Sequence, residues 1–286
     1  MRWRPLQGLS MTVAGSTNVA PIDFHDIHES PLFSDYRTIV LGVTKLYTIK
    51  SKRITSSFSY RNVSDGLFAN VLLTKSWLDN PMLPAQRFLD DYIVNYYKDI
   101  ASFSQSFQAI GNLSKTLDFI RGGVSVNGIF RRNSSTVLSE ELPVHFVRTF
   151  YSVGGQVNTN IGRWLYIAYT FKAFGSSAFS KGAALDNKCN NLLHRFIMDV
   201  SASSKLMFEL NGDYFRNQQS ENTYKDCFLL DSKVKYMLGK KIDLQLLVSN
   251  IMNSRTYSYS IYDTLSRMES VRYLRGREVM LSICLK

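Results

Sequence analysis

The stretch Leu206-Met-Phe-Glu-Leu-Asn-Gly-Asp-Tyr-Phe215 decides the fold, because apolar and polar residues alternate along it. Its even positions hold leucine, phenylalanine, glycine and tyrosine, whereas the odd positions include Glu209, Asn211 and Asp213. A period of two places these sets on opposite faces of a β-strand. Strands of soluble domains average about five or six residues, and a strand that crosses a membrane needs about nine to eleven. The stretch therefore predicts a membrane-crossing β-strand.

The same alternation recurs along most of the chain. It is found downstream at 228–238, 242–248 and 279–285, and upstream at 9–13, 39–60, 67–74, 124–127, 147–153, 165–171 and 196–201. These runs predict an all-β fold of about twelve strands, or about fourteen if two ambiguous regions are each split. We therefore expect residues 1–286 to form part of an antiparallel transmembrane β-barrel.

Two regions give a weaker signal. The strand that begins at Ile39 is expected to break near 50–53 and to resume at Ile54. The region 87–114 is ambiguous, and within it residues 90–98 fit either a helical turn or part of a long strand.

The predicted connections alternate between short and long. Short ones fall near 62–66, 114–116, 158–162, 201–205 and 238–241, and long ones at 15–35, 77–87, 132–142, 174–188, 217–224 and 253–269. Up-and-down barrels have short periplasmic turns and longer external loops. We therefore expect the 253–269 loop to lie beside a ligand entrance and the turn at Gly239 to lie at the opposite end.

Composition agrees with a barrel and argues against other classes. Hydrophobic residues make up 45% of the chain, yet the mean hydropathy is only −0.12, as expected when apolar and polar residues alternate. No run reaches the 18 apolar residues of a spanning helix. The net charge is +11, but no basic run is longer than a pair such as Arg131 and Arg132. Nucleic acid is therefore not expected as a partner.

The sequence contains no motif for catalysis or for a metal. It has no glycine-rich phosphate loop, paired-histidine helix motif or nucleophile elbow. The cysteines, Cys189, Cys227 and Cys284, have no metal-like spacing, and the pair His25 and His28 lacks a third ligand. We therefore expect neither an enzyme nor a bound cofactor.

Charged side chains on the polar faces are the candidates for lining a lumen. They share the odd positions of three neighbouring predicted strands, opposite the apolar residues. The candidates are Arg195, Asp199, Glu209, Asp213, Asp231, Lys233 and Lys235.

Two C-terminal segments carry a distinctive pattern. The first is Asp243-Leu-Gln-Leu-Leu-Val-Ser-Asn-Ile-Met-Asn253, followed by Tyr257, and the second is Tyr273-Leu-Arg-Gly-Arg-Glu278. Together they resemble the last two strands of TonB-dependent outer-membrane receptors. The family commonly has an aliphatic strand ending in Asn-Leu-Phe-Asn, a tyrosine soon after, and a Leu-Arg-Pro-Arg-like segment before the last strand.

Upstream segments resemble one subgroup of that family, which carries a carboxypeptidase-regulatory-like N-terminal extension. They are Tyr60-Arg-Asn62, Gly66-Leu-Phe-Ala-Asn70 and Ser114-Lys115. The chain departs from the family pattern at Gly276, where proline is usual, and at Lys286, where an aromatic or large apolar residue is usual.

The resemblance implies a role in transport at the bacterial outer membrane. It implies that the chain is the C-terminal part of a 22-stranded barrel that imports a bulky nutrient such as a glycan, peptide or metal chelate. The expected partners are outer-membrane lipids, the TonB complex acting through a plug region missing here, and in some members a surface lipoprotein. Residues 1–6 have no apolar signal-peptide region, which fits the expectation of a fragment.

Two alternatives stay open at this stage. The chain could belong to another outer-membrane barrel, such as a passive porin or an autotransporter translocator, which predicts a complete small barrel. It could also be a soluble all-β carbohydrate-binding or adhesion module, which predicts stability in water without detergent.

Overall fold

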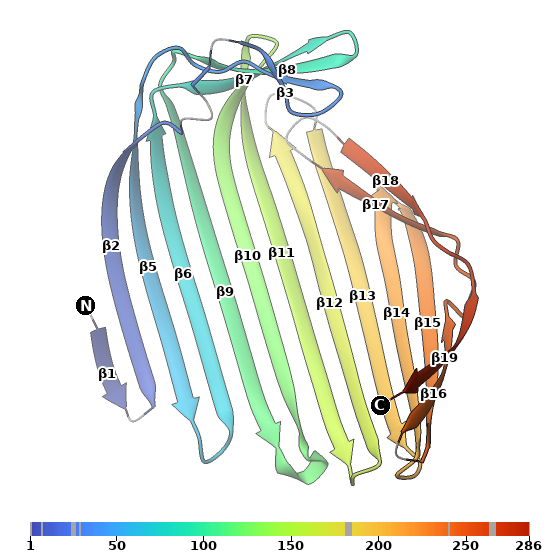
Figure 1. The fold of residues 1–286 in the computed structure, drawn as a ribbon. Coiled ribbons are helices and arrows are strands. Elements are labelled where there is room, and N and C mark those ends of the chain that lie inside the picture. Colours follow the sequence, from blue (N-terminus) through green and yellow to red (C-terminus); the bar gives the residue numbers. More distant parts are fainter. Residues whose placement is uncertain are drawn as a thin grey trace.

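The computed structural model describes residues 2–6, 8–23, 27–28, 30–180, 185–239, 241–262 and 267–285. Most of these residues form one tall, curved β-sheet with short strands at its upper end, and a separate two-stranded hairpin accompanies it (Figure 1). The all-β antiparallel prediction is thereby confirmed. In the described part of the chain, no helix has the length and apolar character needed to cross a bilayer.

Thirteen strands pair in sequence to form the wall, and all of these pairings are antiparallel. In spatial order they are β1 (Arg2–Leu6), β2 (Leu9–Pro21), β5 (Thr48–Asn62), β6 (Leu67–Asn80), β9 (Ser102–Leu117), β10 (Gly122–Ser139), β11 (Leu142–Ile161), β12 (Leu165–Ser180), β13 (Leu185–Ser201), β14 (Leu206–Ser220), β15 (Thr223–Leu238), β16 (Ile242–Ser249) and β19 (Glu278–Leu285). The expected twelve to fourteen wall strands are therefore present. The wall is open, because β1 and β19 are its two edges and do not pair with each other in the described structure.

Six short strands lie outside this series. Four cap the upper end, namely β3 (Leu32–Phe33), β4 (Thr38–Val40), β7 (Leu83–Leu89) and β8 (Tyr92–Lys98). They join the sheet partly through short parallel pairings of β4 with β8 and of β7 with β10. The other two, β17 (Thr256–Tyr262) and β18 (Arg267–Tyr273), form a separate hairpin. A short 3-10 helix, η2 (Asp118–Ile120), joins β9 to β10.

Several predicted boundaries were wrong. The break expected at 50–53 lies instead between β4 and β5, because β5 runs without interruption from Thr48. Residues 90–98 form no helical turn: β8 pairs with β7 as a hairpin. The turn expected at 114–116 comes later, since β9 continues to Leu117.

Most of the predicted long loops are strand for much of their length. β2 runs to Pro21, β6 runs to Asn80, and β10 reaches Ser139, so the expected 132–142 loop is a turn at Glu140 and Glu141. The 217–224 loop is likewise a turn between β14 and β15. Within 174–188, β12 and β13 continue upward, and residues 181–184 lie outside the described residues. Successive connections between wall strands still fall at opposite ends of the wall, as predicted. Antiparallel strands return the chain to the same end at every second connection.

Candidate functional site

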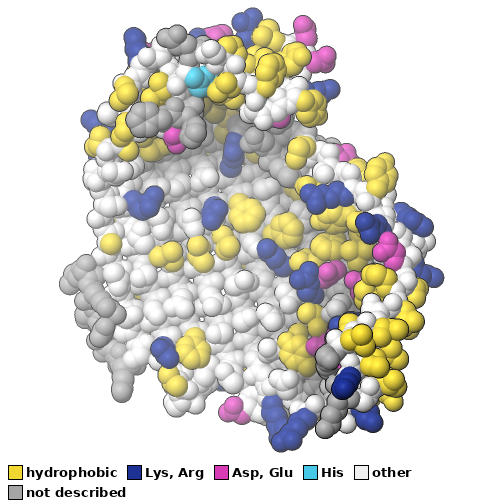
Figure 2. Space-filling view, viewed as in Figure 1, with side chains coloured by type: hydrophobic (Ala, Val, Ile, Leu, Met, Phe, Trp, Pro, Cys, Tyr) yellow, Lys and Arg dark blue, Asp and Glu magenta, His cyan; other side chains and the backbone are white. Residues whose placement is uncertain are grey.

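The two faces of the wall differ in character. On the outer face, large apolar side chains remain exposed although no other layer covers them. Examples are Phe58, Val71, Val126, Phe208 and Leu246, whose exposed fractions are 37%, 40%, 45%, 39% and 41%. The other face carries the polar partners and is hollowed, since the cavities lie along its Ser, Asn and Arg residues. Figure 2 shows the hollowed face, on which hydrophobic and charged side chains are scattered over a largely white surface of backbone and other side chains.

On β6 and β10 the apolar run of the outer face ends at one height. On β6 it runs from Leu67 to Leu73, and Lys75 follows at the next outward position, where its ammonium lies 5.7 Å from the Trp77 ring centroid. On β10, Arg132 occupies the corresponding outward position next to Phe107. Charged residues with a neighbouring tryptophan are typical of the edge of a membrane-facing band. The strands continue above this height.

All seven predicted lumen candidates lie on the polar face of β13, β14 and β15. Two of their pairs are in contact across strands. The Arg195 guanidinium donates from Nε to Asp213 Oδ1 at 2.7 Å and from Nη2 to Oδ2 at 3.1 Å. Lys233 Nζ lies 3.2 Å from both carboxylate oxygens of Glu209. The sequence therefore identified residues that share a face, but their partners became visible only with the strand register.

The remaining three candidates also contact or face neighbouring strands. Lys235 Nζ lies 3.1 Å from Asp243 Oδ2. Asp231 Oδ1 accepts a hydrogen bond from the Asn250 backbone N–H at 2.7 Å. Asp199 lies opposite Glu209 in the β13–β14 register. This part of the wall thus carries acids and bases that largely satisfy one another.

The residues that carry the C-terminal family resemblance hold one junction together. Asn250 has a left-handed backbone, and its side-chain amide donates to the carbonyls of Ser254 and Arg275 at 2.8 and 2.7 Å. The Arg277 guanidinium donates to the Ile251 carbonyl from Nε at 2.9 Å. These contacts join the end of β16 to the start of β19, so the motif residues have a structural role here.

The hairpin β17–β18 lies against the polar face of the upper wall. The Asn217 side-chain amide donates to the Ser258 carbonyl at 3.0 Å, and the Phe215 and Tyr257 ring centroids are 5.1 Å apart. Within the hairpin, hydrogen bonding with Ser270 and then with Arg272 lowers the pKa of Tyr259. The described parts of the segment 253–269, which was expected to be an external loop beside the ligand entrance, therefore fold over the upper end of the polar face, and residues 263–266 lie outside the described residues.

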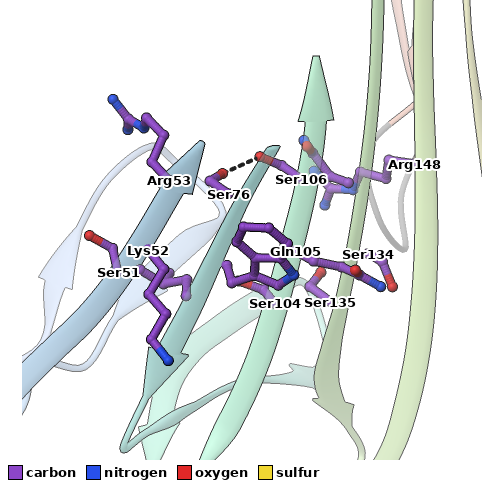
Figure 3. Close-up of a pocket in the computed structure, with 13 residues that line it drawn as sticks. Ser51, Lys52, Arg53, Ser76, Ser104, Gln105, Ser106, Ser134, Ser135 and Arg148 are labelled. Atoms are coloured by element: carbon purple, nitrogen blue, oxygen red, sulfur yellow. Dashed lines mark hydrogen bonds between the residues drawn. The ribbon is translucent and has the colours of Figure 1, made fainter. Parts of the chain in front are cut away.

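A second part of the polar face was missed by sequence reasoning. A cavity of about 440 Å³ extends over β5, β6, β9, β10 and β11. Figure 3 shows Arg53 at one end of it, Arg148 at the other, and Ser76 hydrogen-bonded to Ser106 between them. An adjoining cavity of about 250 Å³ includes Arg131, Arg148 and Phe150. Much of this lining belongs to residues expected to form a loop.

Charge on this part of the wall is of one sign. The polar face of β2, β5, β6 and β9–β12 carries no acidic residue among the described positions, whereas it carries Arg53, Arg61, Arg131, Arg148 and Lys172. At its upper rim, Glu141 pairs with Lys98, and Glu140 accepts the Phe88 backbone N–H at 2.8 Å. We call the surface formed by Arg53, Ser76, Ser106, Arg131 and Arg148 the basic hollow.

Comparison with known proteins gives no family for this chain. No protein-family model matches it, and no curated protein is significantly similar to it.

Proposed function

We propose that the chain forms barrel wall of an outer-membrane receptor that imports a bulky nutrient with energy supplied through TonB. The observation that carries the proposal is that the two faces of one open wall of long strands differ in character. The outer face leaves large apolar side chains uncovered, and the inner face is polar and hollowed. A soluble sandwich would bury its apolar faces against a second sheet, whereas a membrane barrel turns them towards lipid.

Strand length supports a receptor with a tall wall. β10, β11 and β13 contain 18, 20 and 17 residues, whereas about nine to eleven residues cross a bilayer. Because the outward apolar run on β6 stops at Lys75 and that on β10 stops at Arg132, the upper parts of these strands extend beyond the proposed lipid band. A wall of this height encloses space outside the membrane in which a bulky ligand can be held before transport.

The family resemblance adds the energy-coupled mechanism to the proposal. The residues that carry it include Asn250 and Arg277, which form the hydrogen-bonded junction between β16 and β19. In such receptors a plug domain closes the barrel until TonB pulls on it. In this mechanism the chain breaks no covalent bond, and its side chains line the path of the ligand.

The open wall also bears on the choice between receptor and small porin. Each strand of a closed barrel pairs on both sides, and here β1 and β19 each pair on one side only among the described strands. Such edges are sites for pairing with further strands. A receptor barrel supplies those strands, which favours it over a complete small barrel.

Fractionation and conductance test the proposal together. In cells that express the full-length receptor, the protein should be recovered with the outer membrane and should resist carbonate extraction. After reconstitution in planar bilayers it should lack the steady open conductance of a porin, because the plug closes it. Recovery in the soluble fraction would remove the membrane proposal, and a steady large conductance would favour the passive porin.

A further inference from the structure

We infer that the basic hollow binds an acidic oligosaccharide, one that carries carboxylate or sulfate groups. This inference rests on the proposed function, because it names the ligand class that the receptor wall holds. It starts from an imbalance of charge on the polar face. Bases and acids pair on β13–β16, for example in Arg195–Asp213, whereas the strands of the hollow carry bases but no acids on their polar face.

Two arginines of the hollow, Arg53 and Arg131, are available to a ligand. Arg53 and Arg131 are exposed, and neither forms an ion pair with any residue that the structure describes. Arg131 lies opposite Phe150 in the β10–β11 register, and Phe150 is two residues from Arg148 on β11. Arg131 and Arg148 are therefore diagonal neighbours on the same face. Such diagonal neighbours are about 7–8 Å apart. Each guanidinium offers a planar fork that fits carboxylate or sulfate.

The length of the hollow excludes a compact anion as its full ligand. Arg53 and Arg148 lie on strands separated by four inter-strand spacings, or about 19 Å. Inorganic phosphate can reach one end of the hollow but not both. A ligand that contacts both arginines must be extended and must carry at least two anionic groups.

The surface between the arginines suits hydroxyl groups. The Ser76 and Ser106 hydroxyls are 2.6 Å apart, and Ser104, Asn133 and Ser135 also line the cavity. Serine hydroxyls both donate and accept, so they can match the hydroxyls of a sugar in either sense. Phe150, 37% exposed, adds an apolar ring of the kind that packs against the flat face of a sugar. Anionic groups at the ends and hydroxyls between them describe an acidic oligosaccharide.

The test measures binding to the full-length receptor in detergent by calorimetry. The probes are tetragalacturonate, the neutral galactose tetramer of equal length, and inorganic phosphate. We expect tetragalacturonate to bind about tenfold more tightly than the neutral tetramer, as charged hydrogen bonds provide. Its affinity should fall when the salt concentration rises from about 50 to about 300 mM, because salt screens exposed charges.

Matched arginine variants locate the site. Arg53→Gln and Arg148→Gln should each weaken tetragalacturonate binding about tenfold. Arg61→Gln is the control, because Arg61 lies on the same strand and face as Arg53, eight residues or about 26 Å away. The control should bind as the parent does, and circular dichroism should show the same strand content in all three variants.

Three results would overturn the inference. They are equal affinity for the acidic and neutral tetramers, binding of phosphate alone, and unchanged tetragalacturonate binding in both hollow variants. None of these results would contradict the proposed function. That proposal is tested separately, and it fails if the receptor does not fractionate with the outer membrane.

Discussion

The side-chain amide of Asn217 donates to the carbonyl of Ser258 at 3.0 Å, and this bond ties the β17–β18 hairpin to the polar face of β14. Asn217 is only 3% exposed, and Ser258 is 5% exposed. The same carbonyl also accepts a hydrogen bond from Gln219 Nε2 at 3.2 Å, so two buried side-chain amides hold it. The hairpin is thus positioned over the upper wall by buried polar contacts.

The Asn217–Ser258 contact predicts that Asn217→Ala will loosen the hairpin. The substitution removes one of the two hydrogen bonds to this carbonyl and should destabilise the docked hairpin by about 0.5–1.5 kcal/mol. Limited proteolysis of the full-length receptor should then cut between 253 and 273 faster than in the parent. Asn211→Ala is the matched control, since Asn211 is exposed on the same strand and face. Equal cleavage of both variants would mean that the hairpin is held by other contacts.

A second prediction concerns the pair Glu209 and Lys233. Their atoms lie 3.2 Å apart, but both side chains are 31% exposed, so the interaction is screened. A double-mutant cycle with Glu209→Gln and Lys233→Met should give a coupling free energy of about 0.2–1 kcal/mol at low salt. Unfolding in urea measures it, and high salt should reduce it. Coupling that is absent at low salt would indicate a different register between β14 and β15.

A third prediction compares the two faces at adjacent positions of β16. Leu246 is on the outer face between Val234 and Leu281, whereas Gln245 is on the polar face. Leu246→Arg should cost about 2–4 kcal/mol near the bilayer midplane, because it places a charge in lipid, and less nearer the interface. Gln245→Arg is the control and should have little effect. Folding yields of the two variants of the full-length receptor measure the difference, and equal yields would mean that the faces are assigned wrongly.

The strands of the proposed lipid band could be predicted from sequence, whereas their upper extensions could not. Between Leu206 and Phe215 one face meets an apolar medium and the other a polar one, so the residues alternate. Between Arg131 and Thr136 both faces are polar, because this part of β10 lies above the apolar band. A strand with water on both sides leaves no period-two signal, so the sequence pattern predicts a loop there.

Some residues of the candidate site could likewise be predicted from sequence, and others could not. The polar-face candidates from Arg195 to Lys235 were found because they lie within clearly alternating runs. Arg53, Arg131 and Arg148 come together only through the pairing of β5, β6, β9, β10 and β11, which joins residues distant in sequence. Register of this kind cannot be derived from local pattern alone.

A fourth prediction concerns topology. If the short turns are periplasmic, an epitope inserted near Ser258 in the full-length receptor should be labelled on intact cells. An epitope at Gly239, between β15 and β16, should be labelled only after the outer membrane is permeabilised. Uptake should tolerate changes at Gly239 better than deletion of 253–269. Labelling at Gly239 with none at Ser258 would invert the orientation.

The most direct test of the central claim is a nitroxide scan along β14 in lipid vesicles. A spin label is placed at each position from 206 to 215 of the full-length receptor, with Cys189, Cys227 and Cys284 replaced by alanine. Collisions with oxygen, which dissolves in lipid, should peak at even positions such as Phe208 and Leu210. Collisions with a water-soluble nickel complex should peak at odd positions such as Glu209 and Asp213. Equal access of the nickel complex to both sets would contradict the claim that the apolar face meets lipid.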